Sequence, residues 1–117
     1  MKLAIVLLAG SETADGSGRM ANAFITALEA QDAGDEVRVI FDGAGTTWLR
    51  TLADPEHKYH RLLNEVRASI VGACLYCARA YGVVDDVERA EIPLLDEYKH
   101  HPSIRGLVAD GFHVLTF

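Results

Sequence analysis

Residues 3–9, Leu3-Ala-Ile-Val-Leu-Leu-Ala9, give the clearest indication of how this chain folds. These residues are all apolar, and no polar residue alternates with them. A strand needs such a continuous apolar run when helices cover both faces of its sheet. We therefore predict that residues 3–9 form a central strand of a mainly parallel sheet in an α/β protein.

The residues that follow complete a first β-α-β unit. Gly10–Gly18 is polar and glycine-rich, and Met20 and Phe24 then begin a series of apolar residues at helical spacing. Gly34 provides a helix stop, and Glu36–Phe41 is again mostly apolar and rich in β-formers. We predict a loop, a long helix and a second strand, joined by a right-handed crossover.

The rest of the chain shows shorter patterns of the same kind. They predict helices near residues 47–52, 56–66, 75–81, 85–90 and 103–110, and strands at 68–73, 92–95 and 112–117. No repeat or linker divides the sequence. We expect one domain over residues 1–117, a three-layer α/β/α sandwich around a mainly parallel sheet of about five strands.

Composition limits the classes of partner. The net charge of −6 and the pI near 5.2 argue against non-specific binding to nucleic acid or to a membrane surface, which needs a basic face. Lys2 and the apolar run after it resemble a short signal peptide, but the run is at the short limit and Glu12 and Asp15 follow at once. We expect a cytoplasmic protein with neither nucleic acid nor membrane as a partner.

Cys74 and Cys77 are the clearest candidates for a reactive site, because the predicted strand ends and a helix begins there. A thiol at a helix start faces unpaired backbone N–H groups, which favour thiolate and lower the pKa. We expect Cys74 to be the reactive thiol and Cys77, one turn further and more buried, to resolve an oxidised or persulfidated Cys74. The alternative is that both are small buried hydrophobic residues.

Several polar side chains are further candidates. His57 and His60 could complete a Cys₂His₂ zinc set with the two cysteines, but this order is unlike a zinc finger, and we expect both to be solvent-facing polar residues and no metal site. Arg79 is the nearest helical cation and a candidate partner for a thiolate. The pair His100–His101 could face a neighbouring subunit or supply a proton.

The segment Gly10–Gly18 also has the form of an anion-binding loop. Gly16, Gly18 and Ala21 satisfy the relaxed dinucleotide-binding pattern, and Asp42 could be a ribose ligand. The gap between the strand and the glycines is too long for the tight turn of that motif. We expect a flexible loop at the sheet edge beside the cysteines, and whether it binds a small ligand stays open.

The chain resembles the DsrE/DsrF-like family of small sulfur-relay proteins. The resemblance is carried by the first strand, by Val71-Gly-Ala-Cys-Leu-Tyr-Cys-Ala-Arg-Ala-Tyr-Gly-Val83 and by the closing strand His113–Phe117. In that family a cysteine eight residues before a helix-ending glycine carries sulfur as a persulfide. Cys74 stands eight residues before Gly82, so the resemblance implies the carrier role for Cys74 and an accessory role for Cys77.

The same resemblance implies a doubly wound sandwich that assembles into homo-oligomers, trimers or hexamers, and exchanges sulfur with donor and acceptor proteins. Three functions follow as hypotheses. The chain is a sulfur carrier or sulfurtransferase that needs no metal or organic cofactor, a non-catalytic binding or assembly subunit, or a dithiol redox protein. Whether it is an enzyme stays open among them.

Overall fold

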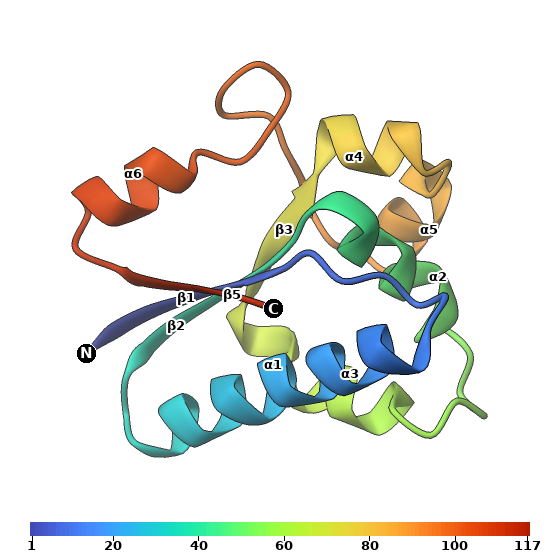
Figure 1. Ribbon diagram of the computed structural model, residues 1–117, viewed down its shortest axis with the longest axis horizontal. Coiled ribbons are helices and arrows are strands. Elements are labelled where there is room, and N and C mark those ends of the chain that lie inside the picture. Colours follow the sequence, from blue (N-terminus) through green and yellow to red (C-terminus); the bar gives the residue numbers. More distant parts are fainter.

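Five strands form one parallel sheet in the order β4-β3-β2-β1-β5 (Figure 1). The strands are β1 (Lys2–Leu7), β2 (Glu36–Phe41), β3 (Ile70–Cys74), β4 (Leu94–Leu95) and β5 (His113–Thr116). The computed structural model describes all residues 1–117. The predicted parallel sheet of about five strands is confirmed, and all carboxyl ends meet at one edge of it.

β1 is the central apolar strand that the sequence predicts. It lies between β2 and β5, and Leu3 to Leu7 are all at most 6% exposed. The strand ends two residues earlier than expected. Leu8 and Ala9 both donate their backbone N–H to the carbonyl of Phe117, 2.8 and 3.1 Å away, and so leave the line of the strand.

Helices and short 3-10 turns connect the strands. They are α1 (Ala14–Asp32), η1 (Gly43–Thr47), α2 (Trp48–Thr51), α3 (His60–Val66), η2 (Arg67–Ser69), α4 (Leu75–Ala80), α5 (Val84–Arg89) and α6 (Ile104–Ala109). The prediction of a helix from residue 56 is wrong at its start, since α3 begins at His60. None of these helices combines the length and the apolar character that a membrane-spanning helix needs.

The start of α1 differs from the sequence prediction. The Thr13 side chain accepts a hydrogen bond from the backbone N–H of Gly16 at 2.9 Å and so caps the helix. The helix therefore includes Gly16 and Gly18, and only Gly10–Thr13 remains outside it. A side chain at Gly16 would meet the carbonyl oxygen of Gly10 at 2.0 Å, which explains why the position holds glycine.

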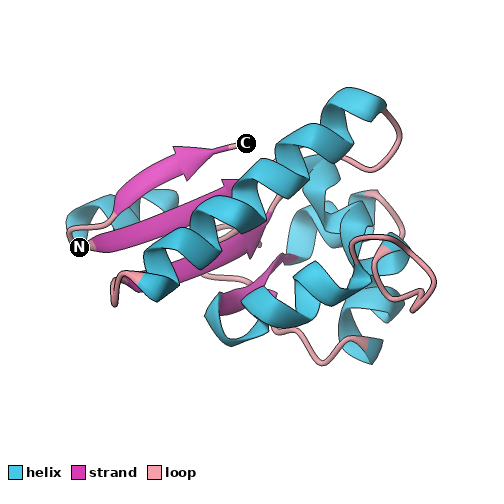
Figure 2. Ribbon diagram, turned by 90° about the horizontal axis from the view of Figure 1, so that it is seen from below, coloured by secondary structure: helices cyan, strands magenta, loops and turns pink.

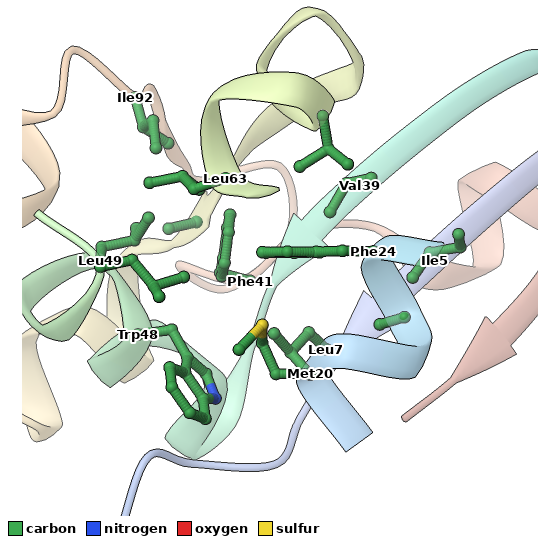
Figure 3. Packing of buried hydrophobic residues seen from close by; sticks show 14 of the residues in the cluster. Ile5, Leu7, Met20, Phe24, Val39, Phe41, Trp48, Leu49, Leu63 and Ile92 are labelled. Atoms are coloured by element: carbon green, nitrogen blue, oxygen red, sulfur yellow. The ribbon is translucent and has the colours of Figure 1, made fainter. Parts of the chain in front are cut away.

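The two faces of the sheet are covered unequally. α1 and α3 pack on one face, where 20 buried residues form the main core (Figure 2). In this core Phe24 of α1 meets Phe41 of β2 edge to face, with ring centroids 6.1 Å apart (Figure 3). The other face holds α6 and a cluster of four buried residues, Ala4, Ile40, Leu107 and Phe112. The three layers of the predicted sandwich are present, and the α6 layer is thin.

Strand register brings separate segments to the same edge. Phe41 of β2 pairs with Ala73 of β3, and Ala73 pairs with Leu94 of β4. The residues that directly follow β2 and end β3, Asp42 and Cys74, are therefore neighbours at the carboxyl edge. α4 starts from the same edge immediately after Cys74.

Candidate functional site

Cys74 is the last residue of β3 and the N-cap of α4. Its sulfur accepts a hydrogen bond from the backbone N–H of Cys77, with a distance of 3.4 Å from N to Sγ. The residue is 0% exposed. The predicted strand-to-helix junction at Cys74 is confirmed, and it places the thiol beneath the surface.

His101 makes the closest side-chain contact of this thiol. Its Nδ1 lies 3.2 Å from Cys74 Sγ, and the Cys74 thiol also points to the carbonyl oxygen of His100 at 3.7 Å. The His101 ring lies against the ring of Tyr76, with centroids 4.8 Å apart. His101 therefore sits between the buried thiol and a tyrosine that is 55% exposed.

A tight turn carries His101 to this position. Tyr98 and His101 exchange backbone hydrogen bonds of 3.0 and 2.9 Å, and the two residues between them, Lys99 and His100, have φ of 47° and 70°. Two positive φ angles are typical of a type I′ turn, which normally uses Asn and Gly. The Tyr76 N–H donates to the carbonyl of His100 at 2.8 Å and ties the turn to α4. The turn lies in the orange loop beside α4 in Figure 1.

Cys77 faces a different partner, Asp42. The Cys77 thiol lies 3.4 Å from Asp42 Oδ1, and that same oxygen accepts the backbone N–H of Gly43 at 2.8 Å. Cys77 is partly exposed, whereas Cys74 is buried. The expectation that Cys77 would be the more buried cysteine is wrong. The turn at residues 98–101 contacts the Cys74 sulfur through His100 and His101.

Four potential ligand or proton-transfer groups therefore meet at one point. One donor atom from each of Asp42, Cys74, Cys77 and His101 lies within 4.8 Å of all the others. They come from the end of β2, the end of β3, the first turn of α4 and the turn before α6. The sequence names all four residues as candidates, and the structure shows that Asp42 and His101 lie with the two cysteines.

The electrostatic environment of Cys74 opposes the sequence expectation. Burial raises the pKa of the Cys74 thiol from 9.0 to about 12, the hydrogen bond from the Cys77 N–H acts against this, and the negative charge of Asp42 adds to it. The prediction of a lowered pKa is wrong. α4 has six residues, and the predicted cation, Arg79, is exposed and makes no hydrogen bond to either thiol.

The structure does not bring the predicted histidine pair to the cysteines. His60 Nδ1 lies 2.6 Å from the carbonyl oxygen of Leu52, and the His57 ring packs against Trp48 with centroids 6.4 Å apart. Neither histidine belongs to the four-residue cluster. The Cys₂His₂ alternative that the sequence left open is therefore not formed.

The segment at Gly10 borders a cleft of about 400 Å³, and neither cysteine lines this cleft. Thr13 and Arg19 contribute to its polar wall, and Phe117 closes one side. None of the five cavities of the structure is lined by Cys74 or Cys77. The Asp42 side chain, considered above as a possible ribose ligand, lies beside Cys77.

Comparison of the sequence and the fold with known proteins identifies the family of this chain. The model of the DsrE/DsrF-like family matches residues 1–117. The uncharacterized protein MJ0733 of Methanocaldococcus jannaschii is 23% identical over 96 residues, which cover 82% of this chain and 78% of that protein. The solved structure of BT1422, a conserved protein of unknown function from Bacteroides thetaiotaomicron, has a TM-score of 0.64 at 18% identity. That comparison covers 97% of this chain and 94% of BT1422, and it shows the same kind of fold.

Proposed function

The chain belongs to the DsrE/DsrF-like family, and on that premise we propose that it carries sulfane sulfur as a persulfide on Cys74. One observation supports this most strongly. Cys74 ends an inner strand of the sheet, and the imidazole nitrogen of His101 lies 3.2 Å from its sulfur. A thiol paired with a base at the carboxyl edge of a parallel sheet is an arrangement that can generate a nucleophile.

The loading step transfers one sulfur atom without net oxidation. With Nδ1 unprotonated, His101 accepts the Cys74 proton, and the thiolate attacks the outer sulfur of a donor persulfide. A new S–S bond forms on Cys74 as the donor S–S bond breaks, and the donor leaves as a thiolate that takes the proton from His101. Release repeats these events in reverse toward an acceptor thiol.

Because Cys74 is buried, the protein must open locally before sulfur can be transferred. Cys74 is 0% exposed, and its pKa of about 12 keeps the thiol protonated in the closed form. A donor can reach the sulfur only when the turn at residues 98–101 shifts to expose Cys74 while His101 stays beside the thiol. The closed form therefore protects the thiol from unwanted oxidation, and sulfur exchange proceeds from an opened form in which water and the Cys77 N–H stabilise the thiolate.

A dithiol redox cycle is the second candidate, because the sulfurs of Cys74 and Cys77 lie within 4.8 Å of each other. A disulfide has an S–S bond of about 2.05 Å, so closure needs a small local rearrangement. Cys77 attack on a Cys74 persulfide would release hydrosulfide and give this disulfide. A titration in redox buffers that detects no reversible intramolecular disulfide would remove this candidate.

The decisive experiment treats reduced, metal-free protein with a small persulfide donor and reads the intact mass. We expect an adduct of one sulfur atom on the wild type and on Cys77→Ala, and none on Cys74→Ala. The Cys77→Ala variant is the matched control, since it keeps the turn and the Cys74–His101 pair. An adduct that survives Cys74→Ala would contradict the assignment of the carrier residue.

A further inference from the structure

The cluster of Asp42, Cys74, Cys77 and His101 has a property that sulfur relay does not require. It combines two thiols, one imidazole and one carboxylate, and one donor atom of each lies within 4.8 Å of the others. Sulfur relay uses Cys74 and a base, with Cys77 as an accessory. The Asp42 carboxylate has no part in that chemistry.

These donor types are those that zinc prefers. Thiolate and imidazole are soft or borderline ligands that select Zn²⁺ over Mg²⁺ and Ca²⁺, and a carboxylate oxygen is an accepted fourth ligand. Four ligands of this kind usually surround zinc as a tetrahedron. The cluster has the number and the type of donors of a closed zinc site.

The distances fit a tetrahedron with small adjustments. Zinc bonds of about 2.3 Å to sulfur and about 2.0–2.2 Å to nitrogen and oxygen put tetrahedral ligand atoms roughly 3.3–3.8 Å apart. The observed separation is 3.2 Å between Cys74 Sγ and His101 Nδ1, and 3.4 Å between Cys77 Sγ and Asp42 Oδ1. The remaining pairs lie within 4.8 Å and need to close by at most about 1.5 Å.

The surroundings already contain outer hydrogen bonds to the ligands. The Cys77 N–H points to Cys74 Sγ at 3.4 Å, and the Gly43 N–H points to Asp42 Oδ1 at 2.8 Å. Such bonds orient metal ligands and stabilise their anionic forms. Asp42 takes part in no ion pair, so a cation would supply the positive charge that the two thiolates and this carboxylate lack.

We propose that Asp42, Cys74, Cys77 and His101 form a four-coordinate Zn²⁺ site. Binding displaces one proton from each thiol and leaves zinc bonded to two sulfurs, one imidazole nitrogen and one carboxylate oxygen. A Cys74 sulfur that is bonded to zinc cannot attack a sulfur donor, and a persulfidated Cys74 no longer offers the thiolate that binds zinc. The zinc-bound and persulfide forms therefore exclude each other. The site thus gives the chain a metal-bound state beyond the proposed relay.

The test is a titration of reduced full-length protein with Zn²⁺ against a chromophoric chelator, repeated with Co²⁺ as a spectroscopic probe. We expect one zinc per chain, and a Co²⁺ spectrum with thiolate charge-transfer bands and tetrahedral ligand-field bands. His101→Gln and Asp42→Asn should each weaken Zn²⁺ affinity by roughly 10–100-fold or more, since loss of even an outer partner has an effect of that size.

His100→Gln and Asp96→Asn are the matched controls. These exposed residues pair with each other at 3.1 Å beside the cluster, and their substitution should leave the affinity unchanged. Absence of stoichiometric Zn²⁺ binding, or wild-type affinity in both His101→Gln and Asp42→Asn, would overturn the site. Circular dichroism of each variant separates loss of a ligand from loss of the fold.

The zinc titration and the persulfide experiment can each give a negative result without affecting the other. Persulfide formation is measured on metal-free protein, so its absence would leave the zinc titration untouched. A chain that accepts sulfur but binds no Zn²⁺ would keep the relay and lose the metal site. Protection of Cys74 and Cys77 from alkylation by Zn²⁺, reversed by a chelator, gives a second readout of the site.

Discussion

At the scale of single residues, the burial of Cys74 has a thermodynamic consequence. The fold raises the pKa of this thiol from 9.0 to about 12, so the folded chain keeps a proton that the unfolded chain loses first. Unfolding is therefore favoured by alkali. The stabilisation is complete below pH 9.0, the ordinary pKa of the thiol, and is lost as the pH rises toward about 12.

We predict that urea unfolding midpoints of the wild type fall as the pH rises above 9.0, the pKa of the unperturbed thiol. Cys74→Ala should show a smaller fall over the same range, because it has no buried thiol to ionise. Cys77→Ala keeps that thiol and should follow the wild type. Parallel curves for the wild type and Cys74→Ala would contradict the prediction.

His101 and His100 form a natural pair for testing the proton acceptor. His101 contacts Cys74 Sγ, whereas the His100 side chain points to Asp96 at 3.1 Å. We predict that His101→Gln slows persulfide formation at neutral pH by about 10²-fold, the lower end of general-base contributions. His100→Gln should react at the wild-type rate. Stopped-flow loss of the donor measures both rates, and equal slowing would show that the imidazole of His101 has no special role.

Residue chemistry was only partly predictable from the sequence. Cys74 and Cys77 stand out as a motif, and Asp42 could have been found with them, because Asp42 and Cys74 follow paired residues of neighbouring parallel strands. The contact between His101 and Cys74 could not be predicted, since it depends on a turn with two positive φ angles in non-glycine residues. The pKa direction was missed because burial beneath that turn outweighs the hydrogen bond at the helix start.

At the scale of elements, the turn at residues 98–101 holds His101 against Cys74. Lys99 has φ of 47°, which proline cannot adopt and glycine adopts without strain. We predict that Lys99→Pro separates His101 from Cys74 and slows persulfide formation, while Lys99→Gly reacts like the wild type. Both variants remove the lysine side chain above the Tyr98 ring, so they differ only in the backbone. Equal rates in the two variants would mean that the turn does not position the histidine.

The short edge strand β4 depends on Gly72 of β3. A side chain there would meet the Pro93 carbonyl oxygen and the Leu95 side chain, both at 2.6 Å. We predict that Gly72→Ala lowers the free energy of unfolding by about 1–3 kcal/mol, the usual effect of overpacking. Gly18→Ala is the control, because its added methyl group meets nothing within 4 Å in α1, and it should stabilise by up to about 1 kcal/mol. Chemical denaturation measures both, and an unaffected Gly72→Ala would show that β4 can shift freely.

Elements with a strong periodic pattern were predicted well, and those defined by capping were not. β2 has the predicted bounds, 36–41, because its apolar run stops at Asp42. The start of α1 was missed, since the glycines after Thr13 indicate a loop by composition, while the Thr13 cap draws them into the helix. The start of α3 was missed for a related reason, because a series of turns occupies residues 53–59.

At the scale of the whole molecule, family membership leads us to expect a homo-oligomer. We predict that sedimentation velocity of the reduced protein gives a trimer or a hexamer over a range of concentrations. An obligate assembly of this kind stabilises each copy by mass action, so the unfolding midpoint should rise with protein concentration. A monomer with a concentration-independent midpoint would contradict the expectation.

The unequal covering of the two sheet faces determines which part of the molecule opens first. One face is held by 20 buried residues and the other by four, and the chain that covers Cys74 leads directly into α6 on the weaker face. Subglobal unfolding units with few buried contacts exchange their amide hydrogens at lower free energy than the rest. We therefore expect α6 and the segment before it to exchange their amide hydrogens at lower free energy than the rest of the chain. On that expectation, local opening of this unit, and not global unfolding, sets how often the buried sulfur meets solvent.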